Sequence, residues 1–179
     1  MSSAAGVSRP TITIARKRGE FLMDYAELTR TFTLADVQAY AVLNGDHNPL
    51  HLDETFAATT RFGARIVHGM LPAGLFGTVF AAAYPGSIYV AQSFAFRAPV
   101  FIGDDVLARC TVTRTWPAGR SGGGSGGVGR VVRCSTQLFA KRDVDARPAH
   151  DKGRDERPAI LCVDGHADVL VPPPNPDDT

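Results

Sequence analysis

Four segments in the second half of the chain alternate apolar and polar residues with a period of two, the pattern of β-strands with one buried face. Their shared apolar faces fall within residues 88–98, 106–112, 132–140 and 161–171. The connections between them are rich in glycine or charge rather than helical, so successive strands are predicted to pair antiparallel as a meander. A further short strand is predicted at residues 30–32.

The first half of the chain shows helical spacing instead. Apolar residues follow Thr33 up to Gly45, which predicts a helix capped at both ends, and a second short helix fits residues 53–60. Residues 69–84 form the most apolar segment and mix large side chains with glycine and alanine. A segment of this length is too short to cross a bilayer and too hydrophobic to lie on a surface. It is predicted to be one long buried helix.

A long central helix wrapped by an antiparallel sheet is the hotdog architecture, so we expect an α+β fold with a single hotdog domain over residues 21–171. The length of 179 residues suits one domain with some surplus chain. Part of that surplus is a loop at 119–129 with seven glycines, and a second is a charged loop at 143–158. The tail from 172 to 179 contains four prolines.

Charge separates the start of the chain from the rest. The formal net charge is +1, but four of the 19 basic residues lie in the first 18 positions, which contain no acidic residue. Residues 1–20 are therefore predicted to be a mitochondrial presequence or a disordered tail, with a cytoplasmic or peroxisomal location as the alternatives. The near-neutral total argues against a nucleic-acid partner, and no stretch is long and apolar enough for a membrane span.

The cysteines are odd in number and widely spaced, at Cys110, Cys134 and Cys162. All three fall in segments with strand-like patterns. This spacing favours reduced thiols packed in the core over a disulfide framework or a zinc site.

The densest polar cluster is the decapeptide NGDHNPLHLD at residues 44–53, between the first two predicted helices. Pro49 prevents a continuous helix there. The loop is therefore expected to be rigid, with its side chains held in fixed directions. Asp46 and Asn48 alone are also typical of an Asx-turn and a helix cap. His47 and His51 are four residues apart, but Pro49 disrupts the helical face that a metal-binding pair requires, so no metal is expected.

The motif Gly45-Asp46-x-Asn48-Pro49-Leu50-His51, with the sequence IVHGM at residues 66–70, resembles the MaoC-like family of (R)-specific enoyl thioester hydratases and dehydratases. The resemblance runs from about Phe32 to Gly77, and a weaker one continues through residues 94–104. The two spaced motifs together make it specific.

The resemblance implies a site. Asp46 and His51 would bracket one water, or the 3-hydroxyl group in the reverse reaction, beside the Cα–Cβ bond of an acyl thioester. The backbone N–H of Gly69 would stabilise the enolate-like thioester oxygen. Asn48 and Pro49 would support the loop, and His68 would either line the site or cap the central helix. No cofactor is implied. Which of the two catalytic groups handles the α-proton stays open.

The same resemblance implies a hydro-lyase whose partner is an acyl thioester of acyl carrier protein or of CoA. The single-domain form most resembles the 3-hydroxyacyl thioester dehydratase of mitochondrial fatty acid synthesis, with an (R)-specific enoyl-CoA hydratase as the alternative. From a different class, a hotdog thioesterase or a non-catalytic acyl-binding hotdog is considered. Arg65 and Arg97 are candidates to meet a carrier phosphate, or are ordinary surface charges. A single hotdog domain leaves one edge of its sheet unpaired, and the resemblance implies a family that works as dimers of such folds. We therefore expect a homodimer.

Overall fold

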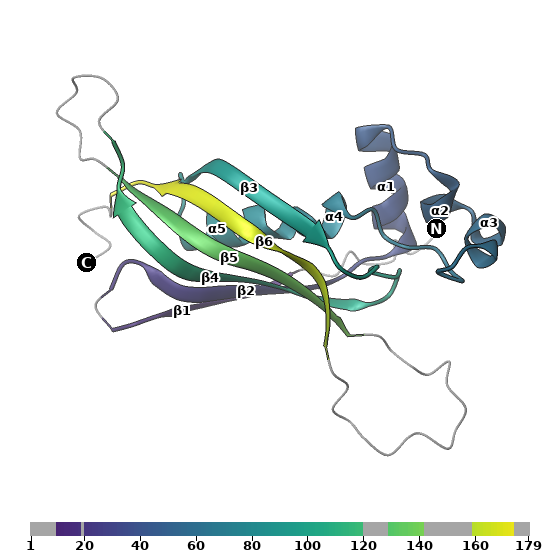
Figure 1. The fold of residues 1–179 in the computed structure, drawn as a ribbon, viewed down its shortest axis with the longest axis horizontal. Helices are drawn as coiled ribbons and strands as arrows, with labels where there is room; N and C mark the ends of the chain where they lie inside the picture. Colours follow the sequence, from purple (N-terminus) through teal and green to yellow (C-terminus); the bar gives the residue numbers. More distant parts are fainter. Residues whose placement is uncertain (1–9, 19, 120–128, 142–158, 174–179) are drawn as a thin grey trace, which may run out of the picture.

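The computed structural model describes residues 10–18, 20–119, 129–141 and 159–173. Six strands form one antiparallel sheet in the order β1-β2-β4-β5-β6-β3. The helices α1, α2 and α3 gather at one end of the molecule, and α5 lies along one face of the sheet (Figure 1). The strands are β1 (Thr11–Arg16), β2 (Met23–Thr31), β3 (Ile88–Phe96), β4 (Asp105–Pro117), β5 (Arg130–Lys141) and β6 (Ile160–Val171).

The first helix begins and ends where the sequence predicts. α1 spans Leu34–Asn44, and Thr33 and Asp36 form a reciprocal capping box at its start. At its end, Gly45 has φ of 80°, a left-handed conformation that favours glycine, and its N–H donates to the carbonyl of Ala41. α2 (Pro49–Leu52) was not expected, whereas α3 (Glu54–Thr59) matches the second predicted helix.

The central helix is interrupted, which corrects the prediction of one long helix at 69–84. It consists of α4 (Met70–Ala73) and α5 (Leu75–Ala83), separated at Gly74. Pro72 has no N–H to donate, and the N–H of Gly77 bonds to the carbonyl of Gly74 only three residues before it. The hydrogen bonding therefore changes in the middle of the segment. Only one face is buried, because Met70, Thr78 and Ala81 are exposed, whereas the sequence predicts a helix buried as a whole.

Strand pairing differs from a simple meander. β4, β5 and β6 pair in succession, but β3 pairs with β6 and not with β4. β4 already has β2 and β5 on its two sides, so the free edge of β6 is left for β3. Gly165 permits this pairing, because a Cβ at that position would collide with the backbone carbonyl of Ser93.

β1 lies inside the segment expected to be a leader or a tail. Thr11–Arg16 pairs with β2 along its whole length, and Ile12 and Ile14 pack against the core. Residues 11–16 therefore belong to the sheet, and the boundary expected at residue 20 falls too late. The strand predicted at 30–32 is likewise the end of a longer one, β2.

Several predicted segments lie outside the described residues: 1–9, most of the glycine-rich loop, the whole of the charged loop at 143–158, and residues 174–179 of the tail. The glycine-rich segment connects β4 to β5, where the N–H of Ala118 donates to the carbonyl of Gly129 at 2.9 Å. No helix in the described part of the chain is long and apolar enough to span a membrane.

The core lies between the concave face of the sheet and α5. Phe76, Val79 and Phe80 of the helix are fully buried there against the inward residues of the strands. The three cysteines are buried and free, as predicted. Burial raises the pKa of Cys134 to about 12 and that of Cys110 further still, so both remain unreactive thiols at neutral pH.

Candidate active site

The polar loop between α1 and α2 is held by its own side chains. The carboxamide oxygen of Asn44 accepts from the N–H of Asp46 at 2.9 Å, and Asp46 Oδ1 accepts from the N–H of Asn48 at 3.1 Å. Asn48 Oδ1 in turn accepts from the N–H of Leu50 at 3.0 Å and caps α2, with Pro49 in its first turn. Asp46 and Asn48 thus make the Asx-turn and cap contacts that their residue types suggest, and these contacts aim the side chain of Asp46.

His51 is buried on α2 with one ring nitrogen engaged. Its Nδ1 lies 2.8 Å from the carbonyl oxygen of Ile66, and a carbonyl oxygen only accepts, so Nδ1 carries the proton in the neutral ring. Nε2 is then left as a lone pair. This is the tautomer that a general base requires.

His68 lies beside both groups and is only 2% exposed. Its Nε2–H donates to the backbone carbonyl of Asp46 at 3.0 Å, and the same nitrogen is 3.9 Å from the Asp46 carboxylate. Its ring stacks on that of His51, with centroids 3.9 Å apart and planes 31° from parallel. Burial, opposed by Asp46 and reinforced by His51 and His47, lowers the pKa of His68 below its ordinary value.

Asp46, His51 and His68 therefore converge, each with one polar atom within 4.8 Å of the others. One water making hydrogen bonds of about 2.8 Å can bridge two atoms at such a separation. The spacing would also admit a metal ion, but Nε2 of His68 donates its proton to the carbonyl of Asp46 and so offers no lone pair there. The arrangement favours a bound water, and the absence of a metal remains a prediction.

A cavity of about 220 Å³ opens next to His51. Gly69 lies on its wall directly before α4 and is exposed, and its N–H has no acceptor among the described residues. The Phe96 ring lies so close that a Cβ on residue 69 would be 2.8 Å from its nearest carbon. Glycine thus leaves room for the Phe96 ring, and Gly69 lines the same cavity as His51. Asp46 does not line this cavity; its carboxylate is half-exposed and lies 3.9 Å from Nε2 of His68.

The arginines divide differently from expectation. Arg65 is engaged, because it forms an ion pair with Glu54 at 2.7 Å. Arg97 lines the cavity and lies 3.6 Å from Asp164. Arg61, which the sequence reasoning did not single out, also lines the cavity and stacks on the ring of Phe62. Arg61 lies within the turn at residues 60–63, and the sequence there does not separate it from an ordinary surface charge.

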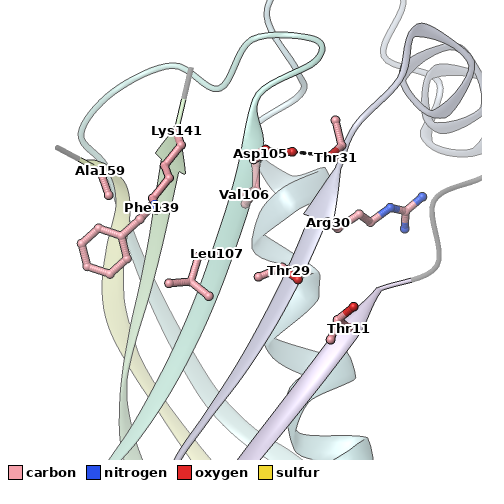
Figure 2. A pocket seen from close by; sticks show the side chains of 10 residues that line it. All are labelled: Thr11, Thr29, Arg30, Thr31, Asp105, Val106, Leu107, Phe139, Lys141 and Ala159. Atoms are coloured by element: carbon pink, nitrogen blue, oxygen red, sulfur yellow. Dashed lines mark hydrogen bonds between the residues drawn. The ribbon is translucent and has the colours of Figure 1, made fainter. Parts of the chain in front are cut away.

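A larger cavity of about 430 Å³ lies elsewhere, across the ends of the strands (Figure 2). Its polar groups are partly engaged with one another, since Thr31 donates to Asp105 and Arg30 pairs with Asp36. It contains no histidine and no cysteine. The volume of a cavity therefore does not identify the active site. The smaller cavity beside His51 is the candidate active site. Figure 2 shows the bond from Thr31 to Asp105, with Leu107 on β4 and Phe139 on β5.

The lowered pKa of His68 predicts a dependence of stability on pH. Between its folded pKa and the ordinary value of about 6.5, the unfolded chain binds a proton that the folded chain does not. This contribution to stability is therefore complete above about pH 6.5 and is lost as the pH falls through the folded pKa. Urea unfolding between about pH 5 and 7.5 measures it. We expect a shallower pH dependence in a His68→Phe variant, and identical slopes in variant and parent would contradict the assignment.

The antiparallel sheet wrapped around a buried helix, with a polar loop beside the start of that helix, defines a hotdog-fold domain of the α+β class, as the sequence predicts. The chain belongs to the family described as the MaoC like domain, which it matches over residues 23–123. The resemblance proposed from the Asp46 to His51 motif is thereby confirmed.

The relatives of known name are hydratases and dehydratases. The chain is 52% identical over 90 residues to an (R)-specific enoyl-CoA hydratase of Aeromonas caviae, covering 49% of this chain and 67% of that protein. It is 45% identical over 84 residues to a mitochondrial 3-hydroxyacyl-[acyl-carrier-protein] dehydratase of Arabidopsis thaliana, covering 47% of this chain and 51% of that protein. The matched segment thus spans about half of this chain, and both of these relatives are named as hydro-lyases, one a hydratase and the other a dehydratase.

Solved structures extend the likeness over more of the chain. An (R)-hydratase from A. caviae involved in PHA biosynthesis superposes with a TM-score of 0.63 at 34% identity, covering 89% of this chain and 97% of that one. An (R)-hydratase of Pseudomonas aeruginosa in the unliganded form gives the same TM-score at 30% identity, covering 92% of this chain and 89% of that one. The fold predicted from sequence is confirmed by these neighbours.

Proposed function

We propose that the protein is a hydro-lyase that interconverts trans-2-enoyl thioesters and (R)-3-hydroxyacyl thioesters. The observation that carries the proposal is the convergence of Asp46 and His51 within reach of one water, with the free Gly69 N–H on the same cavity wall as His51. The hydratases and dehydratases among the relatives support it.

In the hydration direction, a water held between Asp46 and His51 adds its oxygen to Cβ. His51 Nε2, free because Nδ1 is bonded to Ile66, suits removal of a proton from that water. The electrons of the Cα–Cβ double bond move to the thioester oxygen, and a proton then returns to Cα as the carbonyl re-forms. One water is consumed and no net proton is gained, and the elimination of water from the 3-hydroxy compound follows the same path backward.

The transient charge on the thioester oxygen requires a hydrogen-bond donor placed in advance. The Gly69 N–H fits this role because it has no acceptor among the residues described and lies on the cavity wall. Asn48 and Pro49 hold the loop that carries Asp46, a role that the capping contact of Asn48 with the N–H of Leu50 supports. No step of this proposal needs a cofactor or a metal.

The finer proposal is the 3-hydroxyacyl-[acyl-carrier-protein] dehydratase step of mitochondrial fatty acid synthesis. Support comes from the names of the Arabidopsis relative and of a tomato relative, 47% identical over 79 residues. The same two names are the support for a mitochondrial location, because Arg16 belongs to β1 and Arg9 is the one basic residue in the sequence of residues 1–9. The second candidate is (R)-specific enoyl-CoA hydration, which the name of the Aeromonas relative favours.

The test of activity uses crotonyl-CoA and follows the absorbance of the conjugated enoyl thioester. Loss of absorbance without release of thiol supports the hydro-lyase, whereas free thiol would identify a thioesterase, and tight binding with neither change would identify an acyl-binding hotdog. Repeating the assay with crotonyl-acyl carrier protein and with longer chains separates the two carriers by their kcat/KM values.

We also propose a homodimer formed through the edge strand β3. No strand in the described ranges pairs with its outer edge, and three of its apolar side chains are more than half exposed, namely Ile88, Val90 and Phe96. These residues were expected to be buried. β1, the other edge strand, carries no large apolar residue that is exposed. A second copy pairing with β3 about a two-fold axis would cover this apolar edge.

The dimer proposal predicts that Val90→Arg shifts the protein from dimer to monomer, because it places a charge in the apolar edge that the partner would cover. Light scattering coupled to size-exclusion chromatography measures the mass. Tyr25→Arg is the matched control, since Tyr25 is also an exposed apolar residue on a strand but lies on β2, which has a neighbour on each side. A monomeric parent protein, or equal masses for parent and Val90→Arg, would exclude this interface.

A further inference from the structure

We propose that His68 is a positioning residue that fixes the relative placement of Asp46, His51 and Gly69 in the active site. The inference rests on the proposed function and goes beyond it, because it assigns the geometry of the reacting groups to one side chain outside the Asp46 to His51 loop.

Three connections link His68 to the three groups. Its Nε2–H donates to the backbone carbonyl of Asp46 at 3.0 Å, across 22 positions of sequence. Its ring stacks on that of His51 at a centroid separation of 3.9 Å. It also directly precedes Gly69 in the chain, so its backbone position sets that of the Gly69 N–H. A displacement of His68 would therefore shift the acid–base pair and the amide donor relative to each other.

The ring of His68 is held in place by its surroundings. Tyr40 of α1 contacts it at a centroid separation of 5.2 Å with the planes 59° apart. The side chain is 3% exposed, and the carbonyl of His68 accepts from the N–H of Leu71 at 2.9 Å. The ring is packed between Tyr40 of α1 and His51 of α2, which restricts its movement. A positioning residue must itself be held in place in this way.

The Nδ1 atom of His68 does not contribute to the stability of the fold. With Nε2 carrying the proton, Nδ1 is an acceptor, and it is buried without a hydrogen-bond partner among the described residues. A buried polar atom without a partner destabilises the folded state relative to an apolar atom in the same place. A phenylalanine ring would fill a similar volume without this penalty. The imidazole thus contributes something other than packing, and its Nε2–H contact with Asp46 is the candidate.

The charges around His68 keep it a neutral donor. The groups that face it are Asp46 from the loop, His51 from α2 and His47, while Tyr40 packs against it from α1. Burial, as the largest cause, and the two histidines disfavour the protonated form of His68, and they outweigh the attraction of Asp46. A neutral His68 holds Asp46 without competing with His51 for the proton of the bound water.

The test compares two substitutions at residue 68. His68→Phe keeps the ring and removes both nitrogens, whereas His68→Gln removes the ring and keeps an N–H donor. We expect His68→Phe to lower kcat at least tenfold, with KM changed less than threefold and with the melting temperature unchanged or raised. His68→Gln should recover part of the lost kcat. The same two substitutions at His166, an exposed histidine of β6, are the matched controls and should leave kcat unchanged.

Two results would overturn the proposal. One is a His68→Phe variant with the kcat of the parent protein. The other is a loss of activity that merely follows a fall in melting temperature, which would make His68 a structural residue. If either variant does not fold, the remaining one still provides the kcat and melting-temperature comparison.

A readout independent of activity separates this inference from the proposed function. Nitrogen-15 NMR of the histidine side chains reports which ring nitrogen carries the proton. We expect Nε2–H for His68 and Nδ1–H for His51 in the parent protein, and a changed proportion of tautomers at His51 in His68→Phe. These outcomes hold even if crotonyl-CoA is not hydrated. An unchanged His51 spectrum in His68→Phe, or Nδ1–H at His68, would refute the positioning role whatever the enzyme catalyses.

Discussion

His51→Ala is expected to lower kcat for hydration of crotonyl-CoA by about 10³-fold, which corresponds to about 4 kcal/mol of transition-state stabilisation. The reason is the ring geometry. Nδ1–H is bonded to the carbonyl of Ile66, so the free Nε2 is the lone pair that can take a proton from a water in this site. Removing it leaves no histidine in the described lining of the cavity, because His68 is buried and does not line it.

The measurement is steady-state kinetics with the absorbance of the enoyl thioester. His166→Ala is the control, since His166 is exposed on β6 and away from the cavity lining. The melting temperatures of the His51 and His166 variants should both stay within a few degrees of the parent. A His51→Ala variant that retains more than a tenth of the parent kcat would remove His51 from the reaction.

Asp46→Asn is expected to lower kcat by about 10²- to 10³-fold with little change in stability. Asparagine keeps an oxygen that can accept from the N–H of Asn48, so the chain of loop contacts survives the substitution. What is lost is the negative charge beside the bound water and the capacity to share its proton. The effect should therefore appear in kcat more than in KM.

Asp24→Asn provides the comparison for this variant. Asp24 is an exposed carboxylate on β2, in a surface contact with Lys17, and its removal tests the general effect of deleting one negative charge. The double variant Asp46→Asn with His51→Ala should be scarcely slower than His51→Ala alone, because the two groups act on one water. Fully multiplicative losses would mean that Asp46 and His51 act in separate steps.

The sequence predicts the elements of the fold better than their pairing. The capping pattern around Thr33 and the glycine at residue 45 locate α1 to within a residue, because those contacts are local. β3 pairs with β6 because both sides of β4 are already occupied, by β2 and β5. This pairing depends on strands far apart in the sequence, so no local pattern predicts it. β1 was missed for a different reason: its alternating Ile12 and Ile14 are embedded in a basic, acid-free segment whose composition suggests a leader.

The active-site residues could likewise be predicted from local sequence, whereas the contacts between distant segments of the site could not. Asp46, His51 and Gly69 could be proposed from the motif because their family pattern is contiguous or closely spaced. The stacking of His51 on His68 and the bond from His51 to the carbonyl of Ile66 depend on the turn at residues 60–68 folding back on α2, which sequence spacing does not show. The exposure of Val90 and Phe96 was also not foreseen, because apolar alternation indicates a buried face without saying which molecule buries it.

The successive side-chain contacts from Asn44 to Leu50 also bear on the thermodynamics of substrate binding. Each of these contacts restrains the backbone of its own neighbour, so the conformational entropy of the loop is lost when the chain folds and not when a thioester arrives. Every catalytic cycle would then start from one loop geometry. The favourable contacts of the acyl chain and its carrier would not be offset by an entropy loss from ordering this loop.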